Sequence, residues 1–176
     1  LLGEFLAASV LLSSTLKFNG KLILQARSEG QVPLLMAECN DQLQIRGIAR
    51  GADQATALHN SLLLAKGQLV ITLDPTDGQR YQGIVVLEED SLAASIDSYF
   101  ATSEQLGTRI WLAADGTQAS GLLLQQLPAQ ICTEPQIRSA HWEHACTLAA
   151  TVTSQELLQL DPTEPLHRLY HEDPVS

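Results

Sequence analysis

The chain has 176 residues, of which 45% are hydrophobic, and 10 Lys+Arg against 20 Asp+Glu give a formal net charge of -10. This length suits one domain, or one domain with a tail, and allows a sizeable core. The acidic balance argues against nucleic acid, whose phosphates require a basic face, and against anionic membranes. We therefore expect no nucleic-acid partner and no membrane partner.

The first expected element is a buried core helix at residues 4–16. The opening run LLGEFLAASVLLSSTLKF is apolar, but it contains Glu4 and falls short of the ~20 residues that a membrane span needs. No basic segment precedes it, as one would in a signal peptide. A helix that is apolar on nearly all sides belongs inside a protein. Because the chain begins with Leu1 and not Met, we expect a short segment to precede it in the complete protein.

Strand-like segments follow the turn signal Asn19-Gly20. Apolar and polar residues alternate in residues 22–27 and 42–50, which predicts a sheet with one dry face and one wet face. Residues 33–39 are more uniformly apolar and could be covered on both sides. The residues expected on the dry face are Leu22, Leu24, Ala26, Leu43, Ile45, Gly47 and Ala49.

A helix is expected at residues 52–66, because Leu58, Leu62 and Leu63 recur at helical spacing and Gly67 can end it. Residues 68–74 and 79–87 then read as a hairpin joined by a Pro-Thr-Asp-Gly turn. Asp90 or Ser91 can cap the next helix. Its apolar stripe consists of Leu92, Ile96, Tyr99 and Phe100.

A second hairpin is expected from residues 108–114 and 120–127 around Asp115-Gly116, a pair suited to positive φ. Beyond it, Trp142, Ala145, Cys146 and Ala149 share one face of a further helix. Thr153 and Glu156 have capping-box spacing. From Asp161 we expect irregular structure with one helical turn near residues 167–170. The fold class is therefore α+β, with mainly antiparallel sheets, a buried N-terminal helix and helices packed on the sheet.

Few side chains suggest chemistry. The chain has no phosphate-binding Gly-rich loop, no nucleophile elbow, no His-Glu-x-x-His pair and no Cys-x-x-Cys motif. His141, His144 and Cys146 in HWEHAC resemble metal ligands, but zinc prefers four ligands and no second pair lies nearby. Our expectation for this chain is no metal and no catalytic residue.

The cysteines Cys39, Cys132 and Cys146 are too few and too scattered for a disulfide framework, which fits a reducing, cytoplasmic setting. Cys39 lies in an apolar strand beside Glu38, whereas a reactive thiol needs a positive neighbourhood. Cys132 lies in a loop between Pro128 and Pro135, with no histidine close in sequence. A small thiol-dependent enzyme using Cys39 or Cys132 is the alternative function.

Two acidic clusters have structural explanations. The run Glu88-Glu89-Asp90 sits before an expected helix, where negative charge favours the helix N-terminus. The segment from Tyr170 to Asp173 lies in the polar tail, so we expect it to be solvated.

Several long blocks resemble one family, in the right order and over nearly the whole chain. They are GEFLAASVLLSSTLKFNGKLILQ, QIRGIAR, VITLDPTDGQRYQGIVVLEEDSLAASIDSYFATSEQL, LLLQQLPAQ and LHRLYHED. The chain resembles the N-terminal core domain of the redox-regulated heat-shock chaperones, the thirty-three-kilodalton heat-shock holdase family. The resemblance implies an ATP-independent holdase that binds unfolding proteins under oxidative and heat stress and prevents their aggregation.

The resemblance implies a protein with three parts: an N-terminal core, a flexible linker and a C-terminal zinc domain. Zinc would be held there by one Cys-x-Cys pair and one Cys-x-x-Cys pair. Neither pair is present here. The resemblance therefore implies a core at residues 1–160, the start of the linker at 161–176, and zinc in a C-terminal redox-switch domain absent from this chain. It also implies unfolded client proteins as partners and a homodimer. After the holdase and the thiol-dependent enzyme, the third possible function is an inert dimerisation scaffold.

The client-binding surface is predicted from strand alternation alone. Ile23, Val70 and Ile84 sit on the less certain faces of their strands. We take these three residues as the candidate substrate-binding residues.

Overall fold

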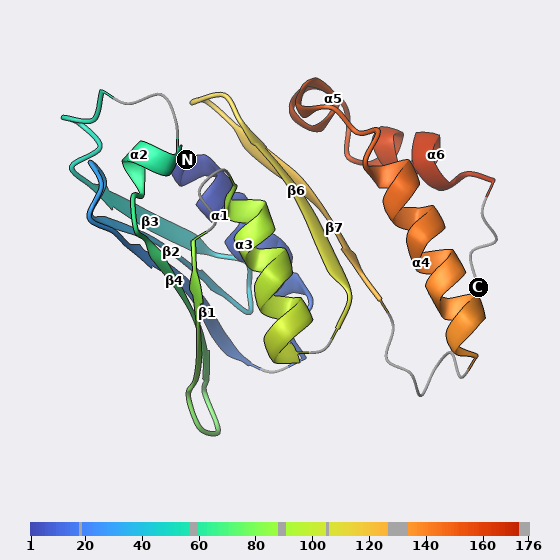
Figure 1. Cartoon of the computed structure of the whole chain (residues 1–176), viewed down its shortest axis with the longest axis horizontal. Coiled ribbons are helices and arrows are strands. Elements are labelled where there is room, and N and C mark those ends of the chain that lie inside the picture. The colour runs from blue at the N-terminus through green and yellow to red at the C-terminus, as the bar shows by residue number, and fades with distance from the viewer. Residues whose placement is uncertain (18, 57–59, 88–90, 105, 127–133, 173–176) are drawn as a thin grey trace.

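A computed structural model describes residues 1–17, 19–56, 60–87, 91–104, 106–126 and 134–172 (Figure 1). Its strands are β1 (Gly20–Arg27), β2 (Leu34–Asn40), β3 (Ile45–Arg50), β4 (Gln68–Pro75), β5 (Tyr81–Val86), β6 (Thr108–Ala114) and β7 (Ala119–Gln125). Its helices are α1 (Leu2–Ser14), α2 (Asn60–Leu63), α3 (Leu92–Tyr99) continued by a π-helical turn (Phe100–Glu104), α4 (Pro135–Ala149), α5 (Ser154–Gln159) and α6 (Thr163–Tyr170). All strand pairs are antiparallel, which confirms the α+β class.

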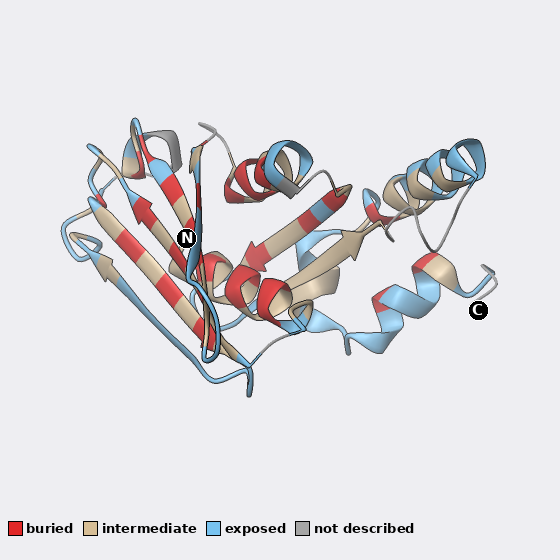
Figure 2. Ribbon diagram, turned by 90° about the horizontal axis from the view of Figure 1, so that it is seen from below, coloured by how far each residue is buried: buried red, intermediate tan, exposed pale blue. Residues whose placement is uncertain are grey.

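A five-stranded sheet of order β3-β2-β1-β4-β5, here called the large sheet, forms one half of the molecule. Along its inner strands buried residues alternate with half-buried ones (Figure 2). Leu22, Leu24 and Ala26 are buried, as expected from the period of two. The expectation that β2 could be covered on both sides is wrong, because Leu34 and Met36 on its other face are only half-buried.

The edge strand β3 differs from the expected dry face. Leu43 lies in the preceding turn with a φ of 57°, and β3 begins at Ile45. Ile45 points to the covered side, since it pairs with the buried Cys39, yet it remains 48% exposed. The alternation is right, but an edge strand has a neighbour on one side only, so its side chains stay partly in water.

Helix α1 lies between the two sheets, with β1, β2 and β3 of the large sheet on one side and the β6–β7 hairpin on the other (Figure 1). This position explains why the helix is apolar nearly all round, because both flanks are in contact with a sheet. Phe5, Ala8 and Leu12 are buried at its centre. Glycines allow the close approach: a Cβ at Gly121 would lie 2.8 Å from Leu11 Cδ1. None of the helices among the described residues is both long and apolar enough to cross a membrane.

The helix expected at residues 52–66 is wrong in its extent, because residues 52–56 are not helical and, among the described residues of this range, the helix comprises Asn60–Leu63. Gly51, with a φ of 78°, begins a turn instead. The following segment bonds to the loop after β1: Val32 donates its N–H to Leu63 O at 2.9 Å. Gln31 Oε1 likewise accepts the N–H of Thr56 at 2.8 Å. Tertiary hydrogen bonds thus replace the helical ones, while Leu58 lies outside the described residues.

The β4–β5 hairpin and α3 follow the sequence pattern. Ser91 caps α3 by accepting the Ala94 N–H at 3.3 Å, and Leu92, Ile96 and Tyr99 are buried. The Tyr99 ring lies against Gly83 of β5, where a Cβ would come within 2.9 Å of Tyr99 Cζ and closer still to Cε2. Helix α3 therefore packs on the same face of the large sheet as α1.

The small sheet, β6–β7, turns at Gly116 with a φ of 95°, which confirms the second hairpin. Beyond it α4, α5 and α6 lie on the side away from the large sheet (Figure 1). The capping box of Thr153 and Glu156 is present as expected.

The helical turn expected near residues 167–170 is part of a longer helix, α6, so the expectation of irregular structure around it is wrong. Arg168 Nε bonds Glu156 Oε1 at 2.8 Å, and Tyr170 donates its hydroxyl to Ala145 O at 2.9 Å. Tyr170 is therefore half-buried against α4, whereas His171 and Glu172 are exposed as expected.

Candidate functional site

The outer face of the large sheet carries exposed apolar side chains. Helices α1 and α3 pack on the opposite face, through positions such as Gly47 and Gly83. On the outer face Ile48, Ile84 and Val86 are 47%, 63% and 70% exposed. Large apolar side chains gathered on one face, in contrast to scattered ones, are typical of interaction surfaces.

The strand register aligns these side chains across the sheet. Ile48 pairs with Met36, Met36 with Gln25, Gln25 with Val70, and Val70 with Ile84. We call the line Ile48, Met36, Val70 and Ile84 the apolar row; Gln25 interrupts it at the centre. Directly opposed residues on one face of a sheet touch one another. The row therefore runs from one edge of the sheet to the other, with a single polar position within it.

Ile23, Val70 and Ile84, the predicted substrate-binding residues, all lie on this outer face. Val70 and Ile84 are direct cross-strand partners within the apolar row. Ile23 belongs to the next cross-strand row on this face, where it pairs with Thr72 on β4, and it is half-buried. Whether these residues bind a client is not tested by their positions, so that role stays a prediction.

Sequence reasoning missed Met36, Ile48 and Val86. For Val86 the signal was present, because Val86 lies two residues after Ile84 in the same strand and so faces the same way. In residues 42–50 the alternation places Ile48 on the same side of the strand as Arg46 and Arg50, which is the side on which it lies in the structure. The alternation could not show that two helices cover the other side and leave this one open.

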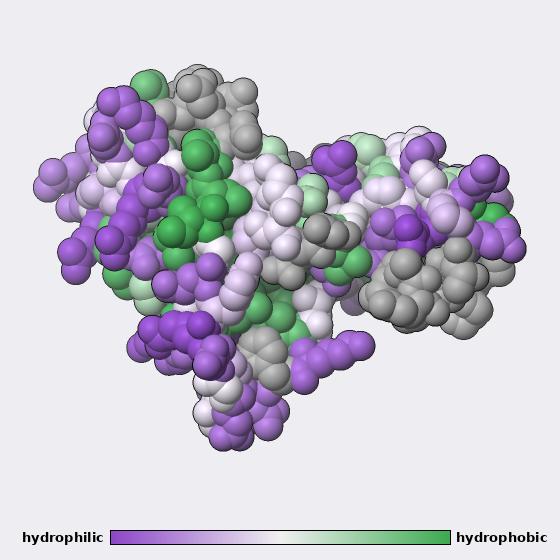
Figure 3. All heavy atoms as spheres, turned by 60° about the horizontal axis from the view of Figure 1, so that its bottom comes forward, coloured by the Kyte–Doolittle hydropathy of each residue, from purple (hydrophilic) through white to green (hydrophobic). Residues whose placement is uncertain are grey.

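Charged side chains border the apolar row. Glu38 is bonded by Lys21 at 3.6 Å and by Arg46 at 3.0 Å. Arg80 forms a two-point contact with Asp74, at 3.0 and 2.8 Å, and this hydrogen bonding lowers the pKa of Asp74. Figure 3 shows hydrophobic (green) atoms on the large-sheet side of the molecule surrounded by hydrophilic ones. An apolar centre with a charged rim is the arrangement of many binding surfaces.

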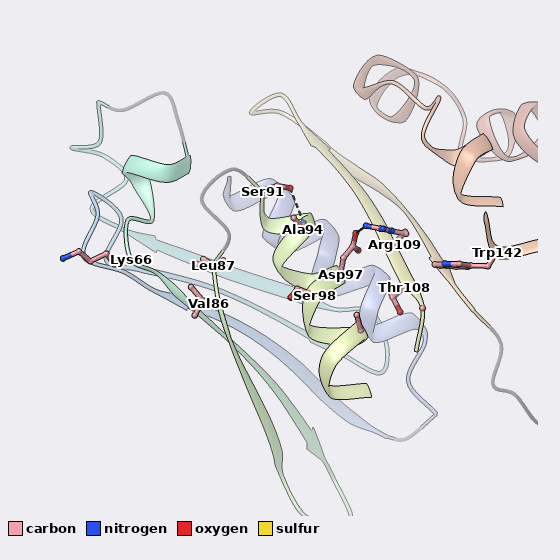
Figure 4. Close-up of a pocket in the computed structure, with 12 residues that line it drawn as sticks. Lys66, Val86, Leu87, Ser91, Ala94, Asp97, Ser98, Thr108, Arg109 and Trp142 are labelled. Atoms are coloured by element: carbon pink, nitrogen blue, oxygen red, sulfur yellow. Dashed lines mark hydrogen bonds and ion pairs between the residues drawn. The ribbon is translucent and has the colours of Figure 1, made fainter. Parts of the chain in front are cut away.

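An open groove of about 1010 Å³ runs beside this sheet, over the solvent side of α3 (Figure 4). Val86 and Leu87 line it where β5 ends, and Arg109 and Trp142 line its far side. Small residues also line it, namely Ser91 at the N-cap of α3, Ala94 and Ser98 of α3, and Ala101 of the π-helical turn. The groove is therefore wide and shallow, without the enclosed shape of a small-molecule site.

Asp97, at the edge of this groove, fastens α3 to β6. Its Oδ1 accepts the N–H of Ile110 at 3.0 Å, and its Oδ2 accepts from Arg109 Nη1 at 3.1 Å. Burial raises the pKa of Asp97, and Arg109 works in the opposite direction. Both carboxylate oxygens have partners, so we assign Asp97 a structural role.

The possible metal ligands do not converge. His141 and His144 are exposed on α4, while Cys146 is half-buried on the face towards Ala149. Among residues that the structure describes, no group of three or more His, Cys, Asp or Glu side chains could hold a metal ion. Within the described part of the chain, His141, His144 and Cys146 therefore do not form a zinc-binding set.

The described thiols lack the features of a nucleophile. Cys39 is fully buried and its Sγ donates to Asn40 O at 3.5 Å. Burial raises the pKa of Cys146, which reduces its thiolate fraction. Cys132 and the run Glu88-Glu89-Asp90 lie outside the described residues, so the thiol alternative stays open for Cys132 alone.

We predict that iodoacetamide at neutral pH labels Cys39 and Cys146 more slowly than a free thiol. The reason is burial for Cys39 and the raised pKa for Cys146. Peptide mass spectrometry over time gives the rate at each cysteine, and the urea-unfolded chain serves as the control. Labelling of any cysteine faster than in urea would favour the thiol enzyme.

Comparison with solved structures places the fold. The chain is similar to the crystal structure of a 33 kDa chaperonin, a heat shock protein 33 homologue, from Thermotoga maritima. The TM-score is 0.77 at 18% identity, with 99% of this chain and 63% of that chain covered. At this identity the likeness establishes the fold alone: an α+β fold shared with that protein.

Sequence comparison then gives the family. A family model described as Hsp33 protein matches residues 1–176. A 33 kDa chaperonin of Pseudomonas syringae pathovar tomato is 56% identical over 177 aligned positions, which cover 99% of this chain and 59% of that protein. One from Pseudomonas aeruginosa is 55% identical, with 99% and 60% covered. The chain belongs to the Hsp33 protein family, and it spans about 59% of the length of these relatives.

Proposed function

We propose that this chain is a holdase core that binds partly unfolded proteins on the outer face of its large sheet and delays their aggregation without ATP. One observation carries the proposal: the apolar row crosses the whole sheet, with Ile48 and Ile84 47% and 63% exposed at its ends. Membership of the Hsp33 protein family supports it, as do relatives named 33 kDa chaperonin.

The physical basis is burial of apolar surface. Covering such side chains contributes roughly 25 cal/mol per Å², less the cost of ordering the client. This attraction has no directional requirement, so many unrelated unfolded segments can use the same row. The formal net charge of -10 opposes non-specific aggregation of the chain with itself while the row is uncovered. The described residues offer no catalytic constellation, and we propose that the chain is not an enzyme.

Regulation belongs to the same proposal. We propose that redox control resides in a zinc-binding module held by cysteine pairs that these 176 residues do not contain. Such a module folds only with its metal, so oxidation of its thiolates releases zinc and unfolds it. We further propose a cytoplasmic, homodimeric protein. The packing of Tyr170 on Ala145 supports a core that includes α6, beyond the boundary at residue 160.

We predict that the purified chain suppresses thermal aggregation of citrate synthase, measured by light scattering, equally with and without ATP. Because neither zinc-binding cysteine pair is present in this sequence, hydrogen peroxide should leave the activity unchanged. Albumin at equal mass is the control for non-specific protection. Unchanged aggregation under all conditions would contradict the proposal, and self-association without client binding would favour the inert dimerisation scaffold.

A further inference from the structure

Strand β5 is an outer edge of the large sheet. Within the described residues it pairs with β4 alone. Leu87 donates its N–H to Gly67 O at 2.9 Å, which sets the phase of the antiparallel ladder. Because hydrogen-bonded and non-hydrogen-bonded positions alternate, Val85 and Gly83 also face β4. The backbone N–H and C=O groups of Gln82, Ile84 and Val86 therefore point away from the sheet.

The two edges of the sheet differ in protection. The other edge strand, β3, carries Arg46 and Arg50, and Arg46 is tied to Glu38 at 3.0 Å. Charged residues of this kind discourage another strand from pairing with an edge. The sequence of β5 is YQGIVV, which contains no charge and no proline. This edge thus combines strand-forming residues with outward backbone groups that no other strand pairs within the described part of the chain.

The groove over α3 meets this edge at the C-terminal end of β5. It begins at Val86 and Leu87 and is lined by the small side chains of Ala94 and Ser98 (Figure 4). A segment alongside β5 would direct alternate side chains to opposite faces of the sheet. One set would continue the apolar row beyond Ile84, and the other set would enter the groove above α3.

We propose that an extended segment of an unfolding protein adds to the large sheet as a further strand along β5, between its free edge and α3. This inference rests on the proposed function and specifies how the client is held. Main-chain hydrogen bonds to Gln82, Ile84 and Val86 give sequence-tolerant affinity, and the flanking apolar row and groove favour segments with alternating apolar residues.

The test compares Ile84→Pro with Ile84→Ala in the full chain. Both variants lose the same apolar side chain, but only proline removes the outward N–H at a position that does not bond to β4, where edge strands tolerate it. We expect Ile84→Pro to bind reduced, carboxymethylated α-lactalbumin about tenfold more weakly than Ile84→Ala. Fluorescence anisotropy gives the affinities, and circular dichroism melting checks that both variants fold.

Hydrogen exchange gives an independent measurement on the unmodified chain. Adding the same α-lactalbumin should slow exchange at the amides of Ile84 and Val86, while the Ile45 and Gly47 amides of the β3 edge keep their rates. Equal affinities of the two variants together with unprotected β5 amides would overturn strand addition and leave the holdase proposal standing. Absence of binding by the unmodified chain would overturn both.

Discussion

Replacing Ile48, Val70 and Ile84 together by glutamine is expected to weaken binding of unfolded proteins about a hundredfold. Each substitution removes an apolar side chain from the apolar row, and burial of three such chains accounts for several kcal/mol. Glutamine already occupies this face at Gln25, so the strands can accept it. The measurement is the affinity for carboxymethylated α-lactalbumin, together with suppression of citrate synthase aggregation.

A matched control uses apolar residues of similar exposure elsewhere. Leu62, Leu160 and Leu166 are 59%, 39% and 45% exposed and lie outside the large sheet. Their triple replacement by glutamine removes comparable surface and should leave the affinity within about twofold, because isolated exposed leucines form no binding strip. If both triple variants bind equally well, or the control loses more, the outer face is not the client surface.

Gly83→Val is expected to destabilise the protein by about 3 kcal/mol or more, in the range of severe overpacking. A Cβ at this position would lie 2.9 Å from Tyr99 Cζ and overlap Cε2 of the same ring. Tyr99, the last residue of α3, is only 2% exposed, so its ring has no free space into which it could move. Urea denaturation measures the free energy of unfolding. As a control, Gln82→Val changes the neighbouring residue, whose side chain faces outward. It should lower the free energy of unfolding by less than about 1 kcal/mol.

A double-mutant cycle isolates the contact of Gly83 with Tyr99. Tyr99→Ala alone should cost about 4 kcal/mol, because it leaves a large cavity. In the double variant the valine side chain occupies part of that cavity, so the loss should be smaller than the sum of the single losses by about 1–2 kcal/mol. Strict additivity would show that the clash with Tyr99 does not cause the loss in Gly83→Val.

Local signals were sufficient for many elements. The Asp115-Gly116 hairpin, the Ser91 cap and the capping box of Thr153 and Glu156 all depend on residues close in sequence. Each could be predicted because turn and cap preferences act over a few residues. The long blocks of family resemblance likewise pointed to the Hsp33 protein family, and the match of the family model over residues 1–176 confirms it.

Signals that depend on distant contacts failed. The expected helix at residues 52–66 is shortened because Val32 and Gln31 bond to its backbone from another loop. Helix α6 forms where irregular structure was expected, since Arg168 and Tyr170 find partners on α5 and α4. In both places tertiary contacts override a weak local preference.

The candidate site shows the same division. Strand alternation singled out Ile23, Val70 and Ile84 within their own strands, and the register shows that all three lie on one face of the sheet. Period two does not tell which face a helix will cover, and only the packing of α1 and α3 leaves the outer face open. The apolar row needs the strand order and register, and the free edge of β5 needs a sheet that ends there. These are contacts between residues far apart in the chain, so the sequence pattern of any single segment does not contain them.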